Sequence, residues 1–114
     1  NLLQMHTFPC ENGDEFPKNQ YTKWFDYDKI KGTLSLRHRQ PGDYLTLPSG
    51  GRKTLKSWMI DEKIPRQERE EIWLLAEEKH ILWIVGHRIS AYYKITEQTK
   101  TILEVEFNGG KSSG

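Results

Sequence analysis

Large apolar residues gather in short runs along the second half of the chain, and polar turn residues separate these runs. Residues 72–76, 80–85 and 101–107 are rich in aliphatic and aromatic side chains. Runs of this length and composition predict β-strands. Residues 77–79 then form a hairpin connection, and residues 86–88 turn the chain after the second run. Because apolar residues in the last run do not alternate perfectly, we expect there a β-bulge or burial on both faces.

Shorter alternating segments occupy the first half of the chain. Residues 24–30 alternate large apolar with charged side chains, and residues 33–39 begin with leucines that alternate with polar residues. Both patterns are typical of short, half-buried strands. Residues 44–47 predict another short strand, which Pro48 ends because proline cannot donate to a strand ladder.

Two short helices are predicted between these strands. Thr54 is a suitable N-cap, and the apolar residues that follow it have the i, i+3, i+4 spacing of one helix face. These residues are Leu55, Trp58 and Met59. Pro65 suits the first turn of a second helix over residues 65–71, which is too short to be stable unless it packs. Together the elements predict an α+β, mainly β domain with two short inserted helices.

The two ends of the chain lack such patterns. Residues 1–22 have no sustained period and contain two prolines, so we predict an irregular linker or the end of a preceding domain. Residues 108–114, with the sequence NGGKSSG, predict a flexible tail. One domain over residues 23–107 remains. A first residue that is asparagine rather than methionine favours a fragment of a longer protein.

Chain length and the distribution of charge limit the possible functions. A chain of 114 residues suffices for about one domain, which excludes a multidomain enzyme. Its 17 basic and 16 acidic side chains nearly cancel, to +1. Residues 37–66, however, carry seven basic and three acidic side chains, or +4, whereas residues 1–36 sum to −1 and residues 67–107 to −3. A basic middle between acidic flanks is compatible with a nucleic-acid partner despite the neutral total.

The residue types also exclude several kinds of site. Cys10 is the only cysteine, which excludes an intrachain disulfide and favours a reducing, cytoplasmic setting. The four histidines lack metal-ligand spacing, and no nucleophile, acid and base form a catalytic motif. No apolar run approaches the roughly 20 residues that span a bilayer, and the N-terminus lacks the pattern of a signal peptide. We therefore expect no catalytic residues, metal or membrane contact.

Two arginines carry the first candidate for binding. Arg37 and Arg39 stand two residues apart at the end of a predicted strand, so their side chains are expected to leave on the same face. Two guanidinium forks on one face suit successive phosphates. The alternative is a solvated charged face, or ion pairs with Asp43 or Glu62. Three cations on or beside the predicted helices would extend the patch: Lys56, Lys63 and Arg66.

The loop over residues 49–54 carries the second candidate. Its sequence, SGGRKT, lacks the spacing of a phosphate-binding P-loop. A basic, glycine-containing loop that leads into a helix would still attract a phosphate through free backbone N–H groups and the positive helix end. The alternative is that the glycines only make a turn and that the cations are solvated.

An ordered set of segments resembles the C-terminal domain of tRNA(Ile)-lysidine synthase. The segments are LRHRQPGDY (36–44), GGRKTLKSWMIDEKIP (50–65), Arg69, ILWIVGHRI (81–89) and KITEQTK (94–100). Order and spacing are kept over roughly residues 33–106. The resemblance implies a fold like that of a domain of the phenylalanyl-tRNA synthetase β chain, which is a small β-sandwich of unusual topology.

The resemblance also implies a function. Enzymes of this family use ATP to join lysine to the wobble cytidine of tRNA(Ile) with a CAU anticodon, which forms lysidine. The chemistry, with ATP and Mg, belongs to an N-terminal domain whose SGGxDS loop is absent here, so no cofactor is expected in this chain. The C-terminal domain would help to hold the tRNA on its acceptor-stem side.

When the family pattern is carried over residue by residue, the resemblance implies six candidates for contact with the tRNA backbone. These are Arg37, Arg39, Arg52, Lys53, Lys56 and Arg66. Gly42 and Asp43 become the structural turn that presents the arginines. The family pattern often has a second lysine where Arg52 stands, and the charge is kept.

The alternative function is a non-catalytic protein-interaction or dimerisation module, in which apolar strands and tryptophans form an interface. A homodimer of the full-length protein is also left open. A stand-alone enzyme is disfavoured because no catalytic set is visible.

Overall fold

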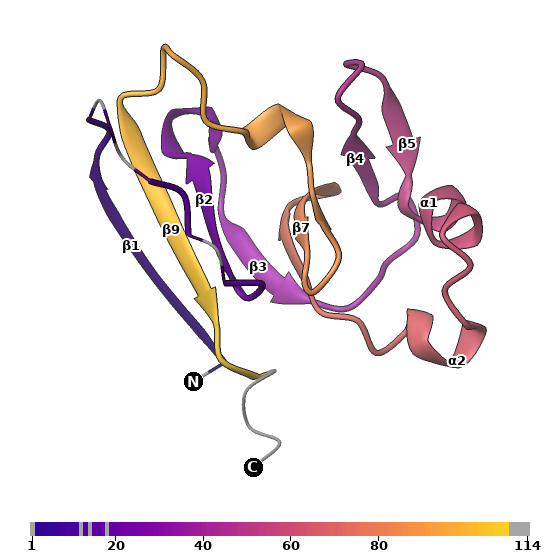
Figure 1. The fold of residues 1–114 in the computed structure, drawn as a ribbon. Coiled ribbons are helices and arrows are strands. Elements are labelled where there is room, and N and C mark those ends of the chain that lie inside the picture. Colours follow the sequence, from indigo (N-terminus) through magenta and orange to yellow (C-terminus); the bar gives the residue numbers. More distant parts are fainter. Residues whose placement is uncertain (1, 12, 14, 18, 110–114) are drawn as a thin grey trace. The chain divides into compact units, whose positions relative to one another are not determined.

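The computed structural model describes residues 2–11, 13, 15–17 and 19–109, which divide between two compact units. Asn1–Ile30 and Tyr93–Gly114 form one, called here the terminal unit. Lys31–Tyr92 form the other, the central unit. In Figure 1 the indigo and yellow ends of the chain therefore belong to the same unit, and the magenta and orange middle to the other.

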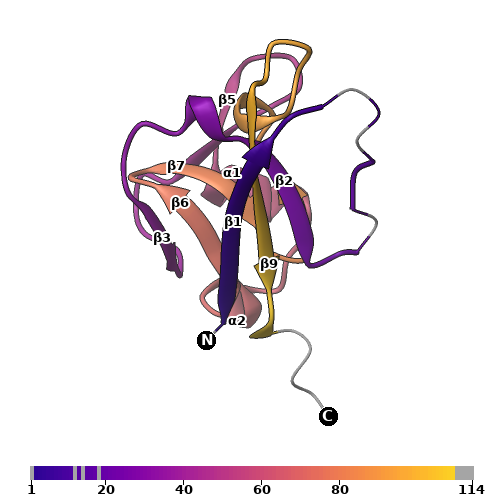
Figure 2. The same ribbon diagram turned by 90° about the vertical axis from the view of Figure 1, so that its left-hand side faces the viewer.

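The terminal unit is built on a three-stranded antiparallel sheet in the order β1-β9-β2. Its strands are β1 (Leu3–Pro9), β2 (Thr22–Asp26) and β9 (Thr101–Phe107), and Figure 2 shows β9 between the other two. The prediction of an irregular segment over residues 1–22 is thus wrong for β1. This strand has little pattern of its own and is largely exposed, so its conformation depends on the backbone ladder that β9 offers.

The structure of β9 distinguishes the two explanations for its imperfect alternation, a bulge and burial on both faces. Both registers of β9 are continuous, from Leu3↔Phe107 to Pro9↔Thr101 and from Thr22↔Glu106 to Asp26↔Ile102. Ile102 and Leu103 are both buried although they point to opposite faces. Burial on both faces, rather than a bulge, therefore explains the imperfect alternation.

The central unit holds a sheet in the order β3-β6-β7-β4-β5, with β8 paired to β7. Its strands are β3 (Leu34–Arg37), β4 (Tyr44–Thr46), β5 (Arg52–Thr54), β6 (Leu74–Glu77), β7 (His80–Ile84) and β8 (Arg88–Ile89). All pairs are antiparallel except β4 with β7. The predicted strand over 24–30 ends early, because a 3₁₀ turn (η1, Tyr27–Lys29) follows Asp26. Strand β5 was not predicted.

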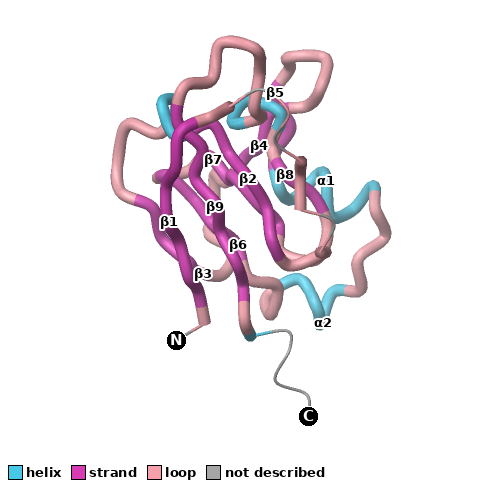
Figure 3. The backbone as a smooth tube through the Cα atoms, turned by 60° about the vertical axis from the view of Figure 1, so that its left-hand side comes forward, coloured by secondary structure: helices cyan, strands magenta, loops and turns pink. Residues whose placement is uncertain are grey.

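Both predicted helices are present, and Figure 3 shows them in cyan among the magenta strands. Helix α1 (Leu55–Asp61) begins as predicted, with the Thr54 side chain accepting from Ser57 N at 3.1 Å. Helix α2 (Arg66–Arg69) follows Pro65 and is shorter than expected. A further 3₁₀ turn, η2, covers Ala91–Tyr93.

The core of the central unit lies between its sheet and α1. Its buried members are Leu45, Leu55, Trp58, Met59, Ile64, Leu74, Ala76, Ile81 and Ile84. The three apolar residues predicted for one face of α1 are among them, which explains why so short a helix is stable here. The predicted fold class is confirmed as a mainly β chain with two sheets and two short helices.

Candidate functional site

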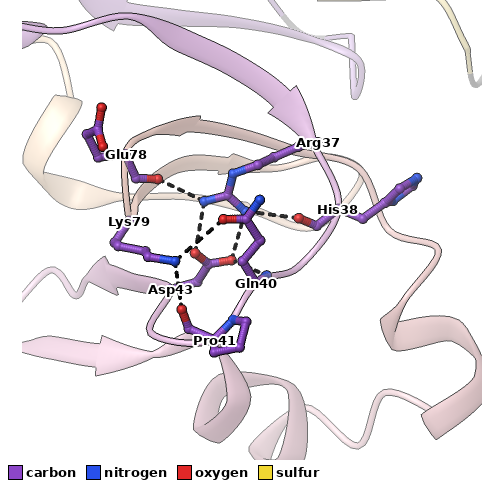
Figure 4. Close-up of polar contacts among 7 residues, drawn as sticks. All are labelled: Arg37, His38, Gln40, Pro41, Asp43, Glu78 and Lys79. Atoms are coloured by element: carbon purple, nitrogen blue, oxygen red, sulfur yellow. Dashed lines mark hydrogen bonds and ion pairs between the residues drawn. The ribbon is translucent and has the colours of Figure 1, made fainter.

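The turn after β3 is held by a buried ion pair, shown in Figure 4. The Arg37 guanidinium donates to both carboxylate oxygens of Asp43, with Nη1–Oδ2 at 3.0 Å and Nη2–Oδ1 at 2.9 Å. The same two nitrogens donate to the main-chain oxygens of His38 at 2.9 Å and Glu78 at 2.8 Å. The Arg37 side chain is 16% exposed and that of Asp43 fully buried. A bidentate pair with these extra bonds fixes two strand ends to each other.

The same carboxylate and a lysine fix the rest of the turn (Figure 4). The Gln40 backbone N–H donates to Asp43 Oδ2 at 2.8 Å. Lys79 Nζ donates to the Pro41 carbonyl oxygen at 2.9 Å. Gly42 has φ +88, a conformation that glycine adopts without strain. Residues 40–43 therefore form a turn that is anchored by side chains from two segments of the chain.

The two arginines expected on one face contact different acids. Strand β3 ends at Arg37, so the alternation on which the expectation rested does not extend to Arg39. Arg39 instead reaches Glu70, with Nε–Oε2 at 3.0 Å. The two guanidinium groups are therefore held by different carboxylates, and the alternative of an ion pair between Arg37 and Asp43 is confirmed.

An open depression of about 500 Å³ lies beside this turn. It is lined by Arg39 and Glu70, by Leu55 and Lys56 of α1, and by residues 40–42. Two cations and one carboxylate give the lining a net positive charge. Lys56 is exposed, and no described carboxylate pairs with it. A positive, open depression of this size suits a phosphate or another oxyanion.

Strand β5 carries two further candidates, Arg52 and Lys53. The Arg52 guanidinium carbon lies 4.3 Å from the centre of the Tyr44 ring. Lys53, the next residue, forms an ion pair with Asp61 of α1. Because neighbouring residues of a strand point to opposite faces, these two charges diverge.

Arg66, the sixth candidate, is an exposed residue at the start of α2. Like Lys56, it has no ion-pair partner among the described residues. The six candidates thus fall into three groups. Arg37, Arg39 and Lys53 contact carboxylates, Arg52 contacts a tyrosine ring, and Lys56 and Arg66 are exposed without an acidic partner.

The glycines of residues 49–51 form a hairpin turn between β4 and β5. Gly50 N–H donates to the Leu47 oxygen at 2.8 Å, and Leu47 N–H donates to the Gly51 oxygen at 2.8 Å. Gly50 has φ +98. Because β5 lies between these glycines and α1, the loop does not open onto the helix. The glycines make a turn, as the alternative expected, but the cations are not simply solvated, because Lys53 pairs with Asp61 and Arg52 lies over the Tyr44 ring.

Sequence reasoning missed Lys79 and Glu70, which contact the turn or its arginine from distant segments. No local pattern marks either residue. Among the described residues, no three His, Cys, Asp or Glu side chains are grouped to hold a metal ion. No helix in this part of the chain is long and apolar enough to cross a membrane.

Comparison with known proteins places this arrangement in a family. Residues 34–106 match the family model described as the TilS substrate C-terminal domain. The chain belongs to this family. A tRNA(Ile)-lysidine synthase of Caldanaerobacter subterraneus subsp. tengcongensis is 46% identical over 95 residues, which cover 82% of this chain and 20% of that protein. The protein of the same name from Clostridium tetani is 41% identical over 101 residues, covering 88% and 22%.

A solved structure agrees with this family membership. The crystal structure of a TilS C-terminal domain superimposes with a TM-score of 0.65 at 26% identity, covering 93% of this chain and 85% of that one. The predicted resemblance to the C-terminal domain of tRNA(Ile)-lysidine synthase is therefore confirmed. The present chain spans about a fifth of the length of the curated relatives it matches.

Proposed function

We propose that this chain holds tRNA for an enzyme that forms lysidine. In this proposal the parent protein is a cytoplasmic ligase. With ATP and Mg, it joins lysine to the wobble cytidine of tRNA(Ile) with a CAU anticodon. The present chain contributes binding rather than catalysis. Family membership and the names of the relatives support the proposal. The observation that carries it is the set of exposed cations in the central unit.

Basic side chains are concentrated in the central unit. Residues 31–92 contain eleven lysines and arginines against eight carboxylates, or +3. Residues 1–30 and 93–114 contain six against eight, or −2. Because phosphate contacts with lysine and arginine supply much of the affinity for nucleic acid, a tRNA would bind the central unit in preference to the terminal unit.

The exposure of each ion pair decides which cations are available to a phosphate. The side chains of Arg39 and Glu70 are 27% and 63% exposed, and Lys53 and its partner on α1 are 28% and 57% exposed. Surface pairs of this kind contribute about 0–1 kcal/mol, so a phosphate can replace either carboxylate at little cost. Arg37 cannot exchange its partner in this way, because its pair is buried.

These differences divide the candidates into two roles. Five cations would contact the tRNA backbone: Arg39, Arg52, Lys53, Lys56 and Arg66. Arg37 would act through the turn that it holds with Asp43, and Gly42 would allow that turn to form. Contacts of this kind recognise the shape of RNA more than its sequence.

A salt titration of tRNA binding tests the proposal. The full chain, with Lys56→Gln and Arg66→Gln combined, is titrated with a tRNA(Ile) transcript that has a CAU anticodon. We expect weaker binding and a log–log salt slope that falls by about 0.7–0.9 for each phosphate that is no longer neutralised. The matched control combines Lys94→Gln and Lys100→Gln, which remove two exposed lysines of the terminal unit. Unchanged affinity and slope in the first variant, or equal losses in both, would contradict the proposal.

A protein-interaction role is the second candidate. Four of the six large apolar residues that are exposed belong to the terminal unit: Leu2, Met5, Phe16 and Tyr27. If these residues form a dimer interface, sedimentation velocity will show a concentration-dependent dimer, and Met5→Ser will weaken it. A monomer at all concentrations would exclude dimerisation through this surface.

A further inference from the structure

Four side chains of the central unit form a continuous column, called here the ring column. Arg52 lies over Tyr44, with the guanidinium carbon 4.3 Å from the ring centre. Tyr44 stacks on His80 with centroids 4.6 Å apart and planes 27° from parallel. His80 in turn contacts Tyr92, with centroids 5.1 Å apart. The column therefore has a cation at one end and a tyrosine at the other.

The sheet positions the first three members of the column. Tyr44↔His80 is the pair that joins β4 to β7, and Thr46↔Arg52 belongs to the β4–β5 ladder. Tyr44 and Thr46 are two residues apart on one strand and so point to the same face. Neighbouring strands thus place Arg52, Tyr44 and His80 side by side, as cross-strand neighbours on one face.

Hydrogen bonds fix the ring at the centre of the column. His80 Nε2 lies 3.0 Å from Thr46 Oγ1 and 3.3 Å from Ser90 Oγ. Ser90 is 1% exposed, and its Oγ also accepts from the backbone N–H groups of Thr46 at 3.1 Å and Tyr92 at 3.4 Å. One buried hydroxyl therefore ties β4, β7 and η2 together. The His80 ring is therefore held in place before any ligand arrives.

The charge state of His80 suits stacking. Burial lowers the pKa of His80, and the Arg52 charge lowers it further, while Glu77 opposes the change. The imidazole is consequently neutral at neutral pH. A neutral imidazole can still form the hydrogen bonds from Nε2 to the hydroxyls of Thr46 and Ser90.

Tyr92, at the outer end of the column, is partly exposed. Tyr92 is 43% exposed, whereas the adjacent Tyr93 is 1% exposed. Packing in the core accounts for Tyr93, whereas the ring of Tyr92 contacts His80 and is partly exposed. Exposed aromatic rings beside cations are the surfaces on which single-stranded nucleic acids stack their bases.

We propose that the exposed ring of Tyr92, supported by the ring column, is a stacking site for an unpaired nucleobase of the RNA that the central unit binds. The site takes a base that is not already stacked in a duplex, because only such a base offers a free π-face. The Arg52 charge at the other end attracts the same polyanionic strand. This inference rests on the proposed function and specifies one subsite of it.

Two RNAs test the stacking site. One is a blunt-ended hairpin, and the other is the same hairpin with a three-nucleotide single-stranded overhang that contains 2-aminopurine. Stacking of one base contributes about 1–3 kcal/mol, so we expect the wild-type chain to bind the overhang RNA about 5-fold or more tightly than the blunt RNA. Binding should also quench the 2-aminopurine fluorescence. Tyr92→Leu should abolish both the preference and the quenching, without changing the salt slope.

Two variants serve as controls. Tyr92→Phe keeps the ring and should retain the preference for the overhang. Tyr27→Leu removes a tyrosine of similar exposure, 46%, from the terminal unit and should have no effect on binding. Circular dichroism verifies that each variant is folded. If Tyr92→Leu does not fold, quenching by the wild-type chain still decides the question.

The outcomes separate this inference from the proposed function. A wild-type chain that binds both RNAs equally, or a Tyr92→Leu variant that keeps the preference, would overturn the stacking site and leave the proposed function supported. Equal losses in Tyr27→Leu and Tyr92→Leu would also overturn it. A wild-type chain that binds neither RNA, nor the tRNA transcript, would overturn both.

Discussion

Seven consecutive residue pairs join β1 to β9 in the terminal unit, whereas the strands of the central unit are two to five residues long. The short strands of the central unit are supplemented by side chains that connect one turn to another, such as the Arg37–Asp43 pair and Lys79. The two units also differ in net charge, −2 against +3. The terminal unit relies mainly on backbone pairing, together with a buried hydrogen bond from Thr99 Oγ1 to Asp26 Oδ2. The central unit relies more on side chains that fix its turns.

This difference shows where sequence changes are tolerated. A strand ladder uses backbone groups that every residue except proline supplies, so exposed side chains of the terminal unit can vary as long as its buried residues, including the bonded pair Thr99 and Asp26, are kept. The turns of the central unit depend on individual side chains. They also lie beside the exposed cations, so the same residues affect both stability and binding.

The largest effect is expected at the buried ion pair. Asp43→Asn leaves the Arg37 guanidinium without a countercharge at a buried position, which should lower the free energy of unfolding by about 3–5 kcal/mol. In the terminal unit, the His6 side chain, 63% exposed, pairs with that of Glu104, 27% exposed. Glu104→Gln should therefore cost less than about 1 kcal/mol. Urea denaturation of the two variants measures the difference, and equal costs would refute the contrast between the units.

The next effect concerns the turn itself. Gly42→Ala places a side chain at φ +88, and should cost about 1–2 kcal/mol of backbone strain. The added Cβ would come no closer than 3.8 Å to Lys79, so no clash adds to this cost. Gly13, in the terminal unit, has φ +90 and nothing within 4 Å of an added Cβ, so Gly13→Ala carries a similar strain.

Only one of these two glycines lines the depression beside the cations. We therefore expect both variants to lose similar stability by thermal denaturation, but only Gly42→Ala to weaken tRNA binding. A loss of binding in Gly13→Ala would contradict the assignment of binding to the central unit.

Acid should affect the ring column of the central unit. The folded pKa of His80 is lowered from its ordinary value of 6.5, first by burial and then by Arg52. Below pH 6.5 the unfolded chain binds more protons at this site than the folded chain, so the free energy of unfolding falls as pH falls. His80→Asn should flatten this dependence between pH 7 and pH 5.

The smallest effect is expected at the surface pair between Arg39 and Glu70. Glu70→Gln should change stability by at most about 1 kcal/mol. Because it removes a carboxylate that competes with phosphate, it should strengthen tRNA binding by a factor of about 1.5 to 5. Glu97→Gln, which removes an exposed carboxylate of the terminal unit, is the control. Weaker binding in Glu70→Gln would show that Arg39 does not contact the RNA.

The elements that local pattern encodes were predictable from the sequence. The strand over 101–107 and the start of α1 after Thr54 depend on apolar spacing and on a capping side chain, which are visible within a few residues. Strand β1 was not predictable, because its conformation is set by pairing with a strand about a hundred residues away. Strand β5 was missed because its three residues are two cations and a threonine, without any apolar pattern.

The candidate site was only partly predictable, for a related reason. Charge counting located the basic stretch, and it also offered an ion pair between Arg37 and Asp43 as one alternative. Whether the Arg37 guanidinium is free or bound also depends on the Glu78 carbonyl, to which it donates. Glu78 lies in another hairpin, so a local pattern around Arg37 does not reveal this contact. Likewise, no spacing in the sequence indicates that Tyr44, His80 and Tyr92 lie in one column.

The pairing of β1 with β9 has a consequence for synthesis on the ribosome. Residues 31–92 contain all strands of their own sheet, so the central unit can form as soon as they have left the exit tunnel. By contrast, β1 can pair with β9 only after Phe107, the partner of Leu3, has also emerged. Bringing such distant residues together slows folding. During that interval the uncharged segment of Leu3–Pro9 has no partner strand. The ladder of Leu3–Pro9 can therefore close only after residue 107 has also left the tunnel.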